Sequence, residues 1–329
     1  MIYPTDKKPL ASSPLLRLGT RGSVLARWQA NWTAEQLKAS GVRVEIIVIQ
    51  TSGDLVQNES IVKMGTQGVF TKEIQRALLE NKIDIAVHSL KDLPTEDVAG
   101  LSLAAVPKRE AYRDAFVSLM AESIEHLPKN ARIGTGSLRR KTQVLHHFGD
   151  KYHVEDIRGN VETRLRKLER GESDALILAE AGLIRLGLAD SIRSFLELPQ
   201  FLPAVGQGAL GWEIRTDDRQ TAELLRPLTD VPTFAAVRAE RAMLRELQGG
   251  CSAPIAALGT VSGSTLTLHG RVLSLDGKQM FDAVQSALLS NEPELLGINV
   301  ARKLHDSYRS FQCVETLSGL PLHPSEPQS

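Results

Sequence analysis

Residues 83–92, Ile-Asp-Ile-Ala-Val-His-Ser-Leu-Lys-Asp, constrain the fold of this chain more than any other segment. The run starts as a short apolar stretch rich in β-branched residues, which is typical of a central strand. It continues without a Gly or Pro spacer into Ser89, Lys91 and Asp92. Because open α/β sheets bind ligands at the carboxyl ends of their strands, a carboxylate beside a cation predicts a functional site here. A structural Lys–Asp pair at a strand end is the alternative.

Apolar periodicity predicts strands that alternate with helices along the first half of the chain. Such alternation implies parallel sheets with crossover helices, so we expect an α/β fold. The predicted strands cover residues 15–19, 42–49, 83–88, 115–119, 132–133, 152–157 and 175–178. The predicted helices cover residues 24–40, 70–80, 137–148, 161–170 and a turn through 184. Further along the chain we expect a glycine-dense segment at 201–214, which either packs closely against another domain or crosses between domains. A helix at 232–247, a hairpin at 266–288 and a helix at 294–307 are predicted after it.

The length of 329 residues exceeds what one hydrophobic core usually fills, so several domains are expected. We predict an N-terminal lobe over 15–108 with a returning segment at about 208–226, a second lobe over 109–207, and a C-terminal domain over 227–320. Residues 1–14 and 321–329 are predicted tails. Residues 51–68 show neither period and contain three glycines, so we expect a mobile lid there.

Composition narrows the class of partner. The 39 basic residues balance the 39 acidic ones, which argues against nucleic acid or a membrane surface as a bulk partner. No apolar run approaches the roughly 20 residues that cross a bilayer. The first fourteen residues lack a signal-peptide core, so we expect a cytoplasmic protein. We also expect the protein to be a monomer. Two cysteines exclude a disulfide framework, and none of the eight histidines has metal-ligand spacing.

Two similar turns predict anion-binding helix ends. Residues 19–23, Gly-Thr-Arg-Gly-Ser, and 134–137, Gly-Thr-Gly-Ser, each follow a predicted strand and open a helix. Arg139 and Arg140 lie in the first turn of the second helix, where positive charge opposes the helix dipole. A bound polyanion would remove that conflict, so we interpret these two and Arg158 as ligand contacts. The alternative is a set of solvated helix faces, which fits Arg166, Lys167 and Arg170.

Cys251 follows two glycines, which bare the backbone and let a reagent approach the sulfur. A lone cysteine can equally be a small buried apolar residue, and we assign Cys313 that role. His88 lies inside a predicted strand, and we expect it to be a structural histidine and not a base.

A series of short motifs spans about residues 15–275. They are Thr20-Arg21-x-Ser23, Phe70-Thr-Lys-Glu73, His88-Ser-Leu-Lys-Asp92, Gly134-Thr-x-Ser-Leu-Arg-Arg140, Arg158-Gly-Asn160, Ala204-Val-Gly-Gln-Gly208, and Glu240-Arg241 leading to Gly249-Gly-Cys251. In this order and at these spacings the chain resembles the porphobilinogen deaminase family, also called hydroxymethylbilane synthases. The resemblance implies two lobes like those of periplasmic binding proteins plus a small α+β C-terminal domain that contains Cys251.

The resemblance also implies a transferase of porphyrin and heme biosynthesis, with a dipyrromethane cofactor attached to Cys251 through a thioether. Porphobilinogen units would add head to tail, each with loss of ammonia, and hydrolysis would release the linear tetrapyrrole hydroxymethylbilane. Asp92 matches the family's catalytic aspartate. The matching cofactor contacts are Ser89, Lys91, Thr135, Ser137, Arg139, Arg140, Arg158, Gly159 and Arg164. The matching substrate contacts are Arg21, Ser23, Phe70, Arg158, Arg164 and Arg185, and no metal is implied.

Two positions depart from the family pattern: Gln67 stands where a basic residue is frequent, and Gly136 stands where Ser is usual. These departures bear on individual loop or cofactor contacts and not on the reaction. The alternative function is a non-enzymatic two-lobed anion-binding protein, because a fold does not fix a function. Asp92 and Cys251 favour the enzyme.

Overall fold

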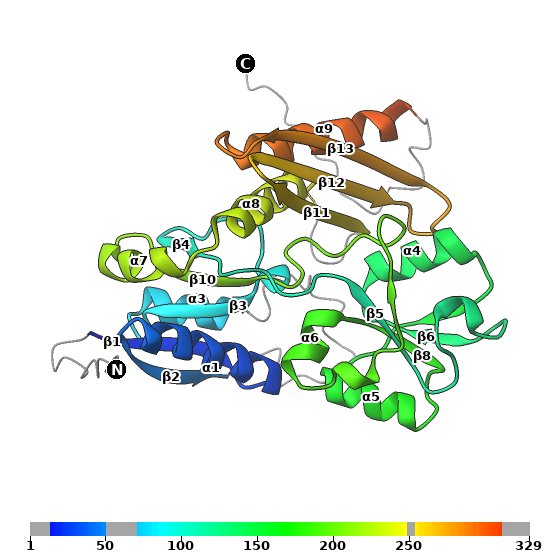
Figure 1. Ribbon diagram of the computed structural model, residues 1–329, viewed down its shortest axis with the longest axis horizontal. Helices are drawn as coiled ribbons and strands as arrows, with labels where there is room; N and C mark the ends of the chain where they lie inside the picture. The colour runs from blue at the N-terminus through cyan, green and yellow to red at the C-terminus, as the bar shows by residue number, and fades with distance from the viewer. Residues whose placement is uncertain (1–13, 51–70, 249–253, 311–329) are drawn as a thin grey trace, which may run out of the picture.

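The computed structural model describes residues 14–50, 71–248 and 254–310. The strands of these residues form two five-stranded sheets and one three-stranded sheet. Figure 1 shows the first sheet at the lower left, the second at the lower right and the third above them. We call the first two units the first and second lobes and the third the C-terminal domain. The structure confirms the predicted α/β class and the division into two lobes and a smaller domain.

The sheet of the first lobe has the strand order β2-β1-β3-β10-β4. Its members are β1 Leu15–Arg21, β2 Arg43–Ile49, β3 Ile85–Ser89, β4 Leu101–Ala105 and β10 Leu210–Arg215. The first three are parallel, whereas β10 is antiparallel to both of its neighbours. The expectation of a parallel sheet was therefore wrong for this part of the lobe, because a strand from far along the chain is inserted between β3 and β4. Trp212 of β10 is fully buried and its indole Nε1 donates to Thr33 Oγ1 at 3.1 Å.

The helices of this lobe are α1 Val24–Ala39, α3 Lys72–Leu79 and α7 Arg219–Leu225. Helix α1 begins where expected, because Ser23 is its N-cap and accepts a hydrogen bond from the Ala26 amide at 3.3 Å. It ends before Gly41, whose φ of +82° suits glycine. The β1–α1 turn is thus fixed by local sequence.

The sheet of the second lobe has the order β7-β6-β8-β5-β9. Its strands are β5 Asp114–Ser118, β6 Arg132–Gly134, β7 His153–Glu155, β8 Ala175–Ala179 and β9 Ser194–Leu196, and its helices are α4 Leu138–Phe148, α5 Val161–Glu169 and α6 Glu180–Arg185. Strand β5 is antiparallel to β8 and β9, so the parallel expectation was wrong here too. Both lobes share this plan of parallel strands plus an inserted antiparallel strand.

The C-terminal domain packs two helices, α8 Val231–Glu246 and α9 Pro293–Ser310, on a sheet of β11 Ile255–Ser262, β12 Thr265–Leu273 and β13 Met280–Leu288. The predicted hairpin is confirmed as β12–β13, and β11 was not predicted. Short 3₁₀ turns occur at η2 Leu90–Asp92, η3 Ile124–His126, η4 Ala189–Ser191 and η5 Arg226–Leu228. No helix in the described part of the chain is long and apolar enough to cross a membrane.

The C-terminal domain meets the segments that run between the lobes at Glu240 of α8, which is fully buried. Its carboxylate pairs with Arg109 at 2.6 Å and accepts hydrogen bonds from the amides of Gly206 and Gly259 at 2.7 and 2.8 Å. The glycine-dense segment packs closely against other backbone, as its composition predicts. An added Cβ at Gly208 would lie 2.6 Å from the carbonyl oxygen of Glu110. The C-terminal domain is therefore joined closely to the crossing between the lobes.

Candidate active site

The end of strand β3 displays its polar residues as the sequence predicts. The strand turns directly into η2, so that Ser89 and Lys91 are half-buried and Asp92 is exposed. Leu90 and Leu93 flank the turn and are buried, with exposed fractions of 1% and 5%. A turn anchored on both sides by apolar side chains gives the Asp92 carboxylate a fixed base beside solvent.

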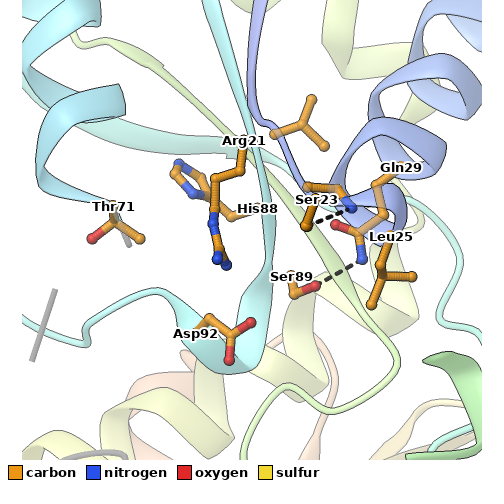
Figure 2. Close-up of a pocket in the computed structure, with 10 residues that line it drawn as sticks. Arg21, Ser23, Leu25, Gln29, Thr71, His88, Ser89 and Asp92 are labelled. Atoms are coloured by element: carbon orange, nitrogen blue, oxygen red, sulfur yellow. Dashed lines mark hydrogen bonds between the residues drawn. The ribbon is translucent and has the colours of Figure 1, made fainter. Parts of the chain in front are cut away.

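A pocket opens at this strand end, between β3 and the β1–α1 turn. Figure 2 shows the Arg21 guanidinium and the Asp92 carboxylate projecting into the same space. Gln29 of α1 donates from Nε2 to Ser89 Oγ at 2.7 Å and so joins the helix to the strand end. The polar lining residues are Arg21, Ser23, Gln29, Thr71, His88, Ser89 and Asp92. The pocket thus unites four residues that the sequence assigned to a site: Arg21, Ser23, Ser89 and Asp92.

His88 lines the same pocket but is held from behind. Its Nε2 lies 3.2 Å from Glu213 Oε2, and Gln75 donates from Nε2 to the other carboxylate oxygen at 3.0 Å. All three side chains are buried. A histidine fixed in this way supports the strand, which confirms the structural role predicted for it.

Lys91 lies in an environment that disfavours its own charge. Burial, together with the nearby Arg140 and Arg139 guanidinium groups, lowers the pKa of Lys91 to about 8, against the opposing effects of Asp92 and Asp114. Arg139 and Arg140 belong to the second lobe, so the charges of the two lobes act on one another at this point. A bound carboxylate would relieve this repulsion.

Arg139 and Arg140 have a partner within the protein, and their contact with a ligand stays a prediction. Both side chains are buried and share the Asp114 carboxylate, at 2.6 Å from Arg139 Nη1 and 2.9 Å from Arg140 Nε. Arg139 also donates to Leu202 O and Arg140 to Ile177 O. Their conflict with the helix dipole is therefore offset inside the protein, and no ligand is needed for that. The two arginines hold the Asp114 pKa well below its usual range, against the effect of its burial.

The remaining predicted arginines lie at turns of the second lobe. Arg164 donates from Nε to Gly159 O at 2.9 Å, and its pKa falls to about 10 because of burial and because Arg140 and Arg158 are near. Arg158 is exposed and pairs with Asp156 at 2.8 Å. Arg185 of α6 is buried, donates to Gly208 O at 2.7 Å and lies 5.8 Å from the ring centre of Trp28. Because Trp28 belongs to α1, Arg185 bridges the two lobes.

The helix start at residues 134–137 has the geometry of a small, open turn. Thr135 is buried and its Oγ1 accepts a hydrogen bond from the Ser137 amide at 3.3 Å, while Ser137 makes no side-chain cap contact with α4. An added Cβ at Gly136 would lie 3.0 Å from Ile157 O and 3.7 Å from Arg164 Nη2. Glycine at this departure from the family pattern therefore leaves space beside Arg164.

These residues fit a ligand with several carboxylates. The charge of Arg140 acts on both Lys91 and Arg164, and the charge of Arg158 also acts on Arg164. Within the described ranges, Arg139 Nε is a buried donor without a hydrogen-bond partner. The same residues include no group of three potential metal ligands. A dipyrromethane, whose rings each bear an acetate and a propionate, matches such an array of donors.

Several predicted features lie outside the described residues: Cys251, Phe70, Gln67 and the predicted lid at 51–68. Sequence reasoning missed Gln29, which reaches Ser89, and Asp114, which holds the two buried arginines. Asp114 had a signal, because an acidic residue opens an otherwise apolar strand. Gln29 lies one helical turn after Leu25, which also lines the pocket, but nothing in the local sequence marked that face of α1 as the ligand side.

The pKa of Lys91 can be tested by competitive acetylation. In a cofactor-free Cys251→Ala protein, we expect the Lys91 amine to become half-reactive at about pH 8, whereas exposed lysines follow the ordinary value of about 10.4. Its positive charge is nearly complete below about pH 7 and is lost as the pH rises through about 8. In the parent protein, bound carboxylates should move the midpoint upward. A midpoint near 10.4 in the cofactor-free protein would contradict the described environment.

Among solved structures, the chain is similar to the methionine-binding protein MetQ. The match covers 69% of this chain and 93% of the MetQ chain, with a TM-score of 0.42 and 12% identity. The match with lipoprotein Tp32 from Treponema pallidum covers 67% of this chain and 93% of the Tp32 chain, with a TM-score of 0.43 and 14% identity. Similarities at this level carry no conclusion about function.

Two family models match the chain. "Porphobilinogen deaminase, dipyromethane cofactor binding domain" matches residues 16–223, and "Porphobilinogen deaminase, C-terminal domain" matches residues 234–306. A porphobilinogen deaminase of Trichlorobacter lovleyi is 52% identical over 80% of this chain and 85% of its own length. One of Geobacter metallireducens is 48% identical over 88% and 91%. The chain belongs to the porphobilinogen deaminase family, a family of transferases of tetrapyrrole synthesis.

Proposed function

We propose that this protein is a hydroxymethylbilane synthase that joins porphobilinogen units head to tail, releases ammonia at each step and frees the linear tetrapyrrole by hydrolysis. The observation that supports this most directly is the exposed Asp92 carboxylate in one pocket with Arg21, Ser23 and Ser89. The arrangement pairs a fixed anion with donors for the carboxylates of the substrate. A two-lobed binding protein would need the donors but has no use for the anion.

Asp92 has the electrostatic task. Porphobilinogen that loses ammonia becomes an azafulvenium-like cation, and the positive charge spreads over the ring and its N–H. A carboxylate fixed beside the ring stabilises that charge as it develops. Since Asp92 is mounted on the end of a buried strand, little reorganisation is needed when the charge appears.

The substrate's own carboxylates need cationic partners. Arg21 and Ser23 extend from the β1–α1 turn of the first lobe into the pocket. Arg185 lies on α6 of the second lobe, 5.8 Å from the ring centre of Trp28 of α1. We assign these residues to the acetate and propionate groups of porphobilinogen, because Arg pairs with carboxylates through two parallel hydrogen bonds.

For the dipyrromethane cofactor we assign attachment to Cys251. Its carboxylates would be held by Ser89, Lys91, Thr135, Ser137, Arg140, Arg158, Gly159 and Arg164, with Arg139 acting through its free Nε. When bound, the cofactor supplies an unsubstituted pyrrole α-carbon as the nucleophile. The excess of positive charge around Arg140 and Arg164 supports this assignment. We further propose a cytoplasmic monomer that binds neither nucleic acid nor membranes, in keeping with its balanced charge and two cysteines.

An intact-mass measurement tests the function. The purified parent should exceed its sequence mass by two linked pyrrole units, and limited porphobilinogen should add discrete heavier species, because each elongation product stays bound. Cys251→Ala should abolish both signals, whereas Cys313→Ala should change neither. A parent at its bare sequence mass that gains no adduct with porphobilinogen would support the anion-binding alternative.

A further inference from the structure

The turn that carries Asp92 rests on the C-terminal domain. Leu90 and Leu93, on either side of Lys91 and Asp92, pack in one buried cluster with Val237 of α8. The Leu90 amide donates to Ala209 O at 3.0 Å, so the turn is also tied to the segment that enters β10. Figure 1 shows α8 lying above the strands of the first lobe. The position of Asp92 therefore depends on a helix of another domain.

Arg241 of α8 makes the polar part of this contact. Its Nη1 donates to Leu93 O at 2.9 Å and its Nη2 donates to Pro94 O at 2.6 Å. The side chain is half-buried, and the two carbonyl groups follow Asp92 directly in the chain. A planar guanidinium that binds two successive carbonyl oxygens fixes both the place and the orientation of that backbone. Neither leucine packing nor a single hydrogen bond would define the orientation as well.

A second arginine on the same helix face makes a contact of a different kind. Arg245, one turn after Arg241, pairs with the Asp97 carboxylate through two hydrogen bonds of 3.0 and 3.1 Å. That pair is exposed, with 49% of the Arg245 side chain and 80% of the Asp97 side chain accessible. Exposed pairs contribute little, so Arg245 provides a matched control for Arg241.

We propose that Arg241 is a positioning residue that holds the backbone after Asp92 and thereby sets the carboxylate in its productive place. The inference rests on the catalytic role proposed for Asp92. Helix α8 leads in sequence to Cys251, a few residues beyond its end at Glu246. The helix that precedes the cofactor cysteine in the sequence thus also contacts the turn that bears the carboxylate.

The main test is a kcat and KM comparison of Arg241→Met, Arg241→Lys and Arg245→Gln. We expect Arg241→Met to lower kcat about 10- to 100-fold with KM within about twofold, since a small displacement of a reacting group has effects of this size. Arg241→Lys should recover part of the loss, and Arg245→Gln should stay within about twofold of the parent. Intact mass should show the same cofactor adduct in all of them.

A readout independent of activity is amide exchange. The Leu93 amide donates to Leu90 O at 3.2 Å, so loosening of the turn should speed exchange at Leu93 in Arg241→Met and not in Arg245→Gln. Unchanged exchange together with unchanged kcat would overturn the positioning role. A rise in KM alone would do the same, because it would place Arg241 in substrate binding.

A double-mutant cycle separates this inference from the proposed function. If Arg241 acts through Asp92, adding Arg241→Met to Asp92→Asn should cost almost nothing further in single-turnover elongation. If the fold-losses in elongation rate of the two single variants multiply in the double variant, Arg241 acts independently of Asp92. That result would overturn the inference while leaving the role of Asp92 intact. Activity within a few-fold of the parent in Asp92→Asn alone would instead overturn the catalytic assignment, and the inference with it.

Discussion

Asp92→Asn is expected to lower the rate of porphobilinogen consumption by about 10²–10³-fold, the usual loss when one group that stabilises transition-state charge is removed. Asn keeps the size and shape of Asp92 and removes only the negative charge. Because the side chain is exposed, folding stability should change by no more than about 0.5 kcal/mol. Steady-state kinetics, circular dichroism and a thermal melt of the same preparation measure these effects together.

Asp97→Asn is the matched control for Asp92→Asn. Asp97 is an exposed acid a few residues further along the same segment, and its partner is Arg245. The Asp97→Asn substitution should leave the rate of porphobilinogen consumption within about twofold of the parent, as expected when an exposed ion pair is lost. Nearly full activity in Asp92→Asn would remove that carboxylate from the mechanism. An equal loss in both variants would point to the net charge of the segment.

Asp114→Asn is expected to lower the free energy of unfolding by about 3–5 kcal/mol, because it leaves two buried guanidinium groups without their anion. Arg139, Arg140 and Asp114 have exposed fractions of 3%, 6% and 2%, so water cannot replace the lost charge. Gln207 also donates to Asp114 Oδ1 at 2.9 Å, which connects the network to the crossing between the lobes. Urea denaturation monitored by fluorescence would measure the change.

The pH dependence of this loss has a definite sign. The Asp114 pKa in the folded protein lies well below its unfolded value, so its stabilising effect is complete above the unfolded pKa of about 3.9 and disappears as the pH falls toward the folded pKa. The difference between parent and variant should hence be constant from about pH 5 to 8. Asp156→Asn, which breaks the exposed pair with Arg158, should cost under about 1 kcal/mol. Equal losses in the two variants would contradict a special role for the buried network.

Local features of the fold were predictable from the sequence. The β1–α1 turn follows from Ser23 as an N-cap, and the end of β3 follows from an apolar run that meets Ser89 and Asp92 without a spacer. The direction of β10 and β5 was not predictable in this way. Strand direction depends on which distant segment forms the neighbouring ladder, and no local period encodes that.

In the candidate site, too, local features were predictable from the sequence and contacts between distant residues were not. Asp92 and the arginines stood out because charges beside glycines and strand ends are conspicuous. The actual partner of Arg139 was missed, because Asp114 lies 25 residues away and meets it only through the sheet. Arg241 belongs to a motif of the family resemblance, but its contacts could not be predicted, since its acceptors at residues 93 and 94 are backbone carbonyls, which every residue has. Contacts to backbone are invisible to a search for paired side chains.

The central place of β10 has a consequence for synthesis on the ribosome. The second lobe draws its sheet from one continuous stretch, residues 114–196, whereas the first lobe lacks a central strand until residues 210–215 have emerged. Until then β3 and β4 have no strand between them, and the space of Trp212 is empty. All strands of the second lobe therefore emerge before the sheet of the first lobe is complete, and the Asp92 turn gains its contact with Ala209 only after them. N-terminal fragments that stop before residue 210 lack the strand that pairs with both β3 and β4.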